Sequence, residues 1–208
     1  MLMTCHCCCI DRMQAEYHRK ERRATKCKRQ LATISTFMCL IQIGMLVAMI
    51  QDDGYAPKSE NPMYGPSAYT MVRYGAKVAV LIKYEGEWWR IITPIFLHAG
   101  IIHIISNVAI QLRVGGYLEL VFGRARFTFI YISSGIYGNM LSCIFLPDSV
   151  GIGSSGAVLG MLTAWIVWIL FRWTKVPRES RSQRNCQLLV VTAAVVLTLA
   201  FSFTDYGS

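Results

Sequence analysis

Five long stretches without a Lys, Arg, Asp or Glu constrain this chain more than any other feature of its sequence. Each is close in length to the roughly 20 apolar residues with which a helix crosses the hydrocarbon core of a bilayer. Backbone in lipid must satisfy its own hydrogen bonds, and the stretches lack the alternation of a membrane strand, so we expect helices. The five predicted spans are Leu31–Ile50, Ile95–Leu112, Phe127–Leu146, Gly156–Phe171 and Gln187–Phe203.

The composition agrees with a membrane protein. Of the 208 residues, 54% are hydrophobic and 16% are charged, which is too apolar a balance for an ordinary soluble domain. We therefore predict an all-α fold, a polytopic bundle of five transmembrane helices. Residues 1–30 are predicted to form a basic cytoplasmic arm, and residues 31–208 to form one membrane domain.

The basic residues sort by predicted side of the membrane, so the net charge of +9 does not indicate a nucleic-acid partner. Residues 1–30 contain eight Lys or Arg, and the positive-inside rule places such segments in the cytosol. The other basic connections hold Arg124, Arg126, Lys175, Arg178, Arg181 and Arg184. The N-terminus is therefore predicted to be cytoplasmic. We expect a secretory or plasma membrane rather than a mitochondrial one, because no Arg/Ser-rich segment free of acidic residues is present.

Polar side chains within the second predicted span form a first candidate cluster, because polar groups are costly in lipid. His103 and Asn107 are four residues apart and share one helical face. For an isolated His and Asn, hydrogen bonding between helices is the more ordinary role. His98 and His103 are five apart, so both cannot point the same way along one helix, and no acidic or Cys partner is near. We predict no metal site.

A glycine-rich turn, residues 151–156, leads into the fourth predicted span and forms a second cluster. Gly153 and Gly156 permit close approach of neighbouring groups. Ser155 would stand at a helix N-terminus, where backbone N–H groups can stabilise an oxyanion. Turns of this kind often only cap helices, so the motif alone is weak evidence for catalysis.

Together, these motifs resemble those of the rhomboid family of intramembrane serine proteases. They occur in the order Trp89-Arg90, His98-x4-His103-x3-Asn107, Gly116-x-x-Glu119 and Gly153-Ser154-Ser155-Gly156. The resemblance implies that Ser155 is the nucleophile, that His103 and Asn107 belong to the oxyanion hole, and that Gly153 and Gly156 shape the site. It also implies cleavage of single-pass transmembrane protein substrates in the bilayer without a metal or organic cofactor, and structural roles for Trp89, Arg90 and Glu119.

The general base is the element that the sequence does not supply. A serine hydroxyl needs a neighbouring base, and the resemblance implies a histidine from a sixth span, yet no histidine follows Ser155. We therefore expect that the sequence is truncated before that span and that the chain as given is inactive or nearly so. We also expect that the Gly156–Gly160 face lacks its expected neighbour, the sixth span. The alternative is a catalytically dead pseudoprotease that binds membrane clients.

Overall fold

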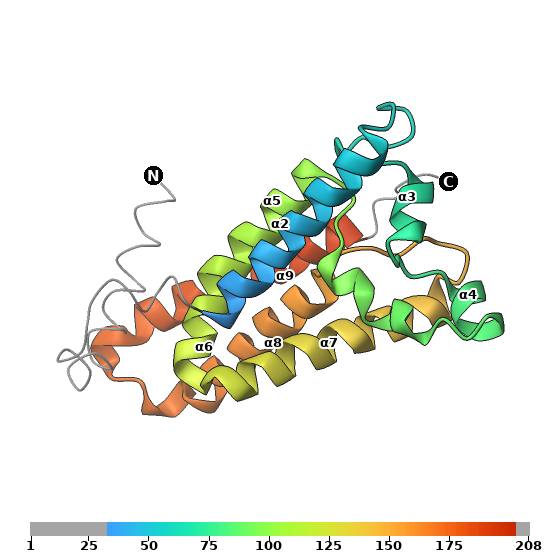
Figure 1. The fold of residues 1–208 in the computed structure, drawn as a ribbon. Coiled ribbons are helices and arrows are strands. Elements are labelled where there is room, and N and C mark those ends of the chain that lie inside the picture. Colours follow the sequence, from blue (N-terminus) through green and yellow to red (C-terminus); the bar gives the residue numbers. More distant parts are fainter. Residues whose placement is uncertain (1–32, 203–208) are drawn as a thin grey trace.

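The computed structural model describes residues 33–202 as a bundle of helices (Figure 1). In this part of the chain, β-type pairing is confined to one isolated bridge between Lys77 and Gly151. The predicted all-α fold is confirmed. The predicted basic arm and the two end residues Leu31 and Phe203 of the predicted spans lie outside the described residues.

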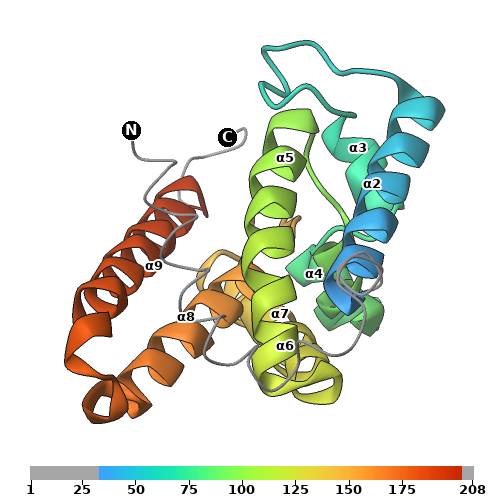
Figure 2. The same ribbon diagram turned by 90° about the vertical axis from the view of Figure 1, so that its left-hand side faces the viewer.

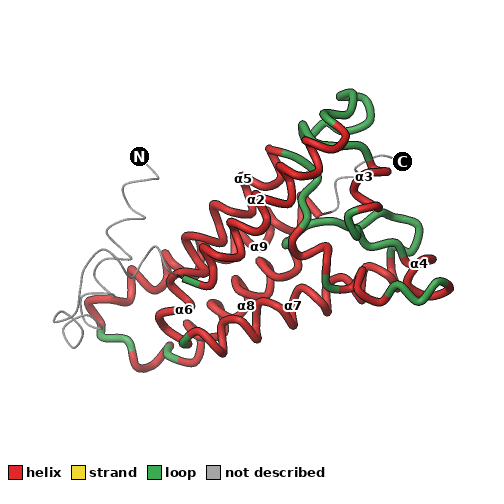
Figure 3. The backbone as a smooth tube through the Cα atoms, in the orientation of Figure 1, coloured by secondary structure: helices red, strands yellow, loops and turns green. Residues whose placement is uncertain are grey.

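The bundle consists of long helical segments joined by short connections, except for the first connection, which has helices of its own (Figure 3). The long segments are α2 (Ile34–Asp53), α5 (Ile101–Ile110) with the π-helical η3 (Gln111–Gly115) and α6 (Gly116–Phe122), α7 (Arg124–Phe145), α8 (Ser155–Phe171) and α9 (Arg181–Ser202). The first connection contains α3 (Ala68–Arg73), α4 (Ala79–Tyr84), η1 (Trp88–Ile91) and η2 (Thr93–Phe96). The last connection contains η4 (Trp173–Lys175) and η5 (Arg178–Ser180).

Three of the described helices are long and apolar enough to cross a membrane, namely Ile34–Asp53, Ile101–Phe122 and Arg124–Phe145. The apolar α8 is shorter, with 17 residues. Large apolar side chains face outward, as for Phe129 and Phe171, which are 73% and 81% exposed. Such a surface suits lipid better than water. The count of five spans stays a prediction.

The second long helix begins later than its predicted range, Ile95–Leu112. Pro94 lies in the first turn of η2, and α5 starts only at Ile101. Between them, Gly100 approaches the carbonyl of Met63 so closely that a Cβ would collide with it. The first connection therefore fixes residues 97–100 in place of the predicted helical turn, while the helix continues through η3 to Phe122.

Small residues let α7 and α8 pack side by side (Figure 1). A Cβ on Gly156 would lie 3.4 Å from the Cα of Gly138, and one on Gly160 would collide with Ser134. Small residues therefore let the two backbones approach closely. Helix α7 therefore contacts the Gly156–Gly160 face. The prediction that this face lacks the neighbour expected from a sixth span stays a prediction.

The core of the bundle lies around α8. Met161, Leu162 and Trp165 of this helix are buried against Phe127 and Tyr131 of α7. On the other side of α8, α9 contributes the buried Val191 (Figure 2). Helix α8 is therefore covered on more than one side, and its N-terminus is positioned by the bundle.

A buried polar network also joins the helices. The Tyr131 hydroxyl donates to Gln111 Oε1 (2.7 Å) and accepts from Gln42 Nε2 (2.9 Å). At the end of the same network, the Ser35 hydroxyl donates to the Gln111 carbonyl (2.8 Å). These bonds connect α2, η3 and α7 away from water.

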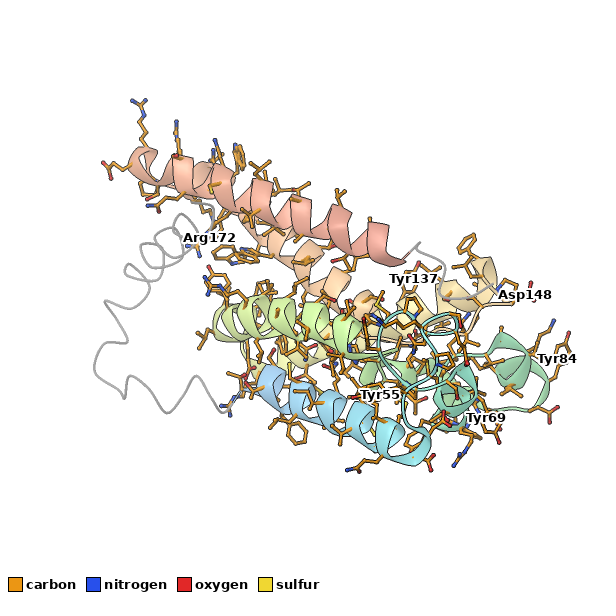
Figure 4. The ribbon with its side chains drawn as sticks, turned by 90° about the horizontal axis from the view of Figure 1, so that it is seen from above. Tyr55, Tyr69, Tyr84, Tyr137, Asp148 and Arg172 are labelled. Atoms are coloured by element: carbon orange, nitrogen blue, oxygen red, sulfur yellow. The ribbon has the colours of Figure 1, made fainter. Side chains whose placement is uncertain are left out.

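The two ends of the bundle differ in their residues. Tyr69, Tyr84 and Asp148 lie at the end that carries the first connection, and Arg172 lies at the opposite end (Figure 4). The basic α8–α9 connection is therefore remote from the first connection, in agreement with the charge sorting. Which end faces the cytosol stays a prediction.

Candidate active site

Ser155 is the first residue of α8 and is half-buried. The residue before it, Ser154, is fully buried, and Gly153 has a φ of +118°, which favours glycine. The first backbone bond of α8 runs from the Val158 N–H to the Ser154 carbonyl (2.8 Å). The backbone N–H groups of Ser155 and its next two neighbours therefore precede the helical ladder and lie at the positive end of the helix.

The segment before Ser155 is hydrogen-bonded to the first connection. Lys77 and Gly151 exchange two backbone bonds, of 2.8 and 2.9 Å. The Gly153 N–H donates to the carbonyl of Pro94 (3.0 Å). The placement of Ser155 therefore depends on residues far from it in sequence.

His103 packs directly against this turn. A Cβ on Gly153 would lie 2.7 Å from His103 Cε1 and 3.0 Å from Nε2. The Ala99 N–H donates to His103 Nδ1 (3.4 Å), which assigns the proton of a neutral ring to Nε2. An N–H donor of His103 therefore faces the turn that leads to Ser155.

Asn107 lies one helical turn after His103 and is buried. Its Nδ2 donates to the carbonyl of His103 (3.1 Å), a bond internal to α5. The structure thus brings His103 to the Gly153 turn, and keeps Asn107 on the same helix with its amide bonded to α5.

His98 and Ser154 also belong to this site, although no role was predicted for Ser154. His98 is fully buried, and its Nε2 lies 3.3 Å from Ser154 Oγ. The rings of His98 and His103 are 5.2 Å apart and nearly perpendicular. The expectation that the two side chains cannot point the same way along one helix does not apply, because His98 precedes α5.

Residues 33–202 contain no group of three or more His, Cys, Asp or Glu side chains that could hold a metal ion. Protein metal sites typically use three or four ligands.

The other motif residues have structural contacts. Arg90 is 7% exposed and donates to the carbonyls of Val72 (2.6 Å) and Ala76 (3.0 Å), and it pairs with Glu87. It therefore ties η1 to the end of α3. Glu119 accepts from the Ser35 N–H (3.3 Å) near the N-terminus of α2. These contacts agree with the structural roles expected for Arg90 and Glu119.

Comparison with known proteins places the chain in a family. The model of the Rhomboid domain matches residues 85–207, which is more than half of the chain. RHOMBOID-like protein 7 of Arabidopsis thaliana is 40% identical over 114 residues, covering 55% of this chain and 36% of the relative. RHOMBOID-like protein 6, mitochondrial, of the same plant is 37% identical over 152 residues, covering 73% and 48%. Rhomboid-like protease 1 of Toxoplasma gondii is 35% identical over 143 residues, covering 68% and 47%.

The chain spans less than half the length of these three curated relatives. The matched region includes η1, the second long helix and the turn before α8, so it contains every residue of the candidate site. With its apolar helices, the chain is an integral membrane protein and belongs to the rhomboid family, a family of intramembrane serine proteases.

Proposed function

We propose that this chain is a rhomboid-type serine endopeptidase that cleaves single-pass transmembrane proteins, with Ser155 as the nucleophile. The observation that carries the proposal is the contact between the His103 ring and Gly153, two residues before Ser155. It places a side-chain donor beside the N-terminus of α8, where backbone donors already converge. A carbonyl in reach of Ser155 would meet both.

The proposed reaction is acyl transfer. Ser155 Oγ attacks the scissile carbonyl carbon, and the carbonyl oxygen becomes an oxyanion. The Ser155 backbone N–H, His103 Nε2–H and the Asn107 amide stabilise that charge, for which Asn107 must turn its second N–H toward the site. The C–N bond then breaks, the amine leaves with a proton, and water releases the acyl group from Ser155. Loss of one oxyanion donor costs about 100- to 1000-fold in rate in other serine proteases.

The proton of Ser155 needs an acceptor. His103 Nε2 is assigned as a donor by the Ala99 bond, and His98 Nε2 is paired with Ser154. No histidine follows Ser155 in the printed sequence. We therefore expect the 208-residue chain to react slowly, and imidazole added to the solution to accelerate it by acting as the missing base.

A fluorophosphonate probe, which reacts with activated serines, tests the proposal. The chain in detergent should be labelled in the presence of imidazole, and the label should be lost in Ser155→Ala. The matched control is Ser133→Ala, because this hydroxyl of α7 bonds to carbonyls of its own helix. Labelling of Ser133→Ala should equal that of the unchanged chain.

The alternative is a pseudoprotease that binds membrane clients without cutting them. It would be favoured if Ser155 stays unlabelled with and without imidazole while the folded chain still binds a transmembrane peptide in micelles.

The proposed location is a secretory or plasma membrane, with the N-terminus in the cytosol. The charge distribution supports it, while one relative is named as mitochondrial. A fluorescent fusion to the C-terminus should colocalise with secretory or plasma-membrane markers. Colocalisation with mitochondria would contradict the proposal. The orientation is tested with an N-terminal tag on isolated vesicles, because added protease should remove a tag that faces the cytosol.

A further inference from the structure

Lys77 is a fully buried lysine in the first connection, between α3 and α4. Lysine is almost never fully buried unless its ammonium group is paired. The sequence marks it only as one of several basic residues in a long loop. Its surroundings in the structure are specific, and none of the motif residues described above accounts for them.

The ammonium group of Lys77 closes the C-terminal end of α7. Its Nζ donates to the carbonyl of Leu146 (2.8 Å), to Ser149 Oγ (3.1 Å) and, at 3.5 Å, to the carbonyl of Ser142. The Leu146 carbonyl also accepts from Ser149 Oγ (2.9 Å), and the Ser142 carbonyl accepts from the Leu146 N–H (2.9 Å). Lys77 adds further donors there, and its charge meets the negative end of the helix dipole.

The backbone and stem of Lys77 hold the next part of the same segment. Lys77 and Gly151 are bonded through both their N–H and their C=O groups. A Cβ on Gly151 would lie only 2.7 Å from the Cε of Lys77. One residue of the first connection therefore contacts the segment between α7 and α8 at its first residue, Leu146, and again in its middle, at Ser149 and Gly151.

We propose that Lys77 is a positioning residue for Ser155, which fixes the segment 146–154 and through it the start of α8. The inference rests on the proposed function, because it assigns Lys77 to the nucleophile's placement. It acts through the segment and touches no reacting atom. Displacements of about 1 Å at a reacting group can cost about 100-fold in rate, so a clamp on this segment matters even though Lys77 is remote from the chemistry.

The test compares Lys77→Met with Lys77→Arg in the full chain. Methionine keeps an unbranched stem against Gly151 but removes every donor, whereas arginine retains donors and charge. The matched control is Lys83→Met, because Lys83 is an exposed lysine of the neighbouring α4. Two quantities are measured in each variant: backbone hydrogen exchange in residues 146–156 with α2 as the reference, and fluorophosphonate labelling of Ser155 with imidazole.

We expect exchange in residues 146–156 to be at least about tenfold faster in Lys77→Met, with α2 unchanged, and labelling to fall about tenfold. Lys77→Arg should restore most of both, and Lys83→Met should match the unchanged chain. Unchanged exchange in Lys77→Met would overturn the inference. So would an equal acceleration in α2, since that is a loss of general stability. Where the unchanged chain is labelled, labelling that stays the same in Lys77→Met while exchange accelerates would overturn it too.

The two proposals fail in distinguishable ways. If Ser155 is labelled in no variant, the proposed function fails, while faster local exchange in Lys77→Met would still support the clamp on the segment. If Lys77→Met does not fold, Gly151→Ala probes the same contact from the other side. It should accelerate local exchange in the same segment, and unchanged exchange in that variant would count against the inference.

Discussion

The turn that carries Ser155 is supported from two sides by different interactions. Toward α7, the support is close packing, in which Gly156 meets the backbone of Gly138 and Gly160 meets Ser134. Toward the first connection, it is hydrogen bonding, through Lys77 and the carbonyl of Pro94. The first side should therefore be sensitive to added volume, and the second to lost donors.

The largest effect should come from adding volume on the packed side. In Gly160→Leu the new side chain collides with Ser134, and overpacking of this kind costs about 3 kcal/mol. The control is Gly44→Leu, because a Cβ there has nothing within 4 Å. Unfolding by SDS titration measures both variants. If Gly160→Leu and Gly44→Leu were equally stable, the packed side would not be the more sensitive to added volume. In a second test, Ser134→Gly should partly restore the stability that Gly160→Ala loses.

A smaller loss of stability is expected at Gly153, which has both a positive φ and a close contact with His103. Gly153→Ala combines a φ of +118° with a Cβ that lies 2.7 Å from His103 Cε1. Gly123→Ala shares a positive φ, +83°, but has nothing within 4 Å of its Cβ. We expect Gly153→Ala to lower the free energy of unfolding by about 1 kcal/mol more than Gly123→Ala does. Labelling of Ser155 should fall only in Gly153→Ala. A similar loss in both variants would mean that the His103 contact is unimportant.

Loss of a hydrogen-bond donor in the bundle interior should destabilise the chain less than the glycine substitutions do. Tyr131→Phe removes the hydroxyl that bonds both Gln42 and Gln111, and we expect a loss of about 1 kcal/mol. Tyr137→Phe on the same helix is the control, because its ring is 63% exposed. Thermal unfolding in detergent distinguishes them, and a stable Tyr131→Phe would show that this network does not stabilise the bundle.

The smallest effect should be a pH dependence from Lys77. Burial lowers the pKa of its ammonium group, and nearby Cys143 and Asp148 partly oppose the shift. The unfolded chain then holds the proton to higher pH than the folded chain, so stability should rise as pH passes from the lowered pKa toward about 10.4. The neutral amine still has N–H donors for the carbonyl of Leu146. In thermal scans, Lys83→Met should keep this rise and Lys77→Met should lose it.

The two sides also differ in how far the sequence predicts them. The glycine-rich turn predicted Ser155 at the start of a helix, because that signal is local. Lys77 and Gly151 are far apart in sequence, and a lysine in a long loop is usually solvated. Only the tertiary contacts of Lys77 show that it is buried.

Other contacts also depend on the tertiary structure. The proximity of His98 to His103 depends on where α5 begins, which close contact between Gly100 and Met63 decides. Gln42 and Gln111 carried a usable signal, since both are amides within predicted spans, where polar groups need partners. Their shared partner, Tyr131, could not be chosen from sequence because aromatic residues are common in such helices.

The π-helical stretch η3 changes the direction in which the side chains of α6 point relative to those of α5, although the three segments follow one another without a break. An α-helix advances about 100° per residue, and a π-helical turn usually marks one inserted residue. His103 can thus face Gly153 while Glu119 faces the N-terminus of α2. Deleting one residue from Gln111–Gly115 would rotate one half against the other by about 100°, so a single length change here would disturb either the Gly153 contact or the anchoring of α2, even though it alters neither residue.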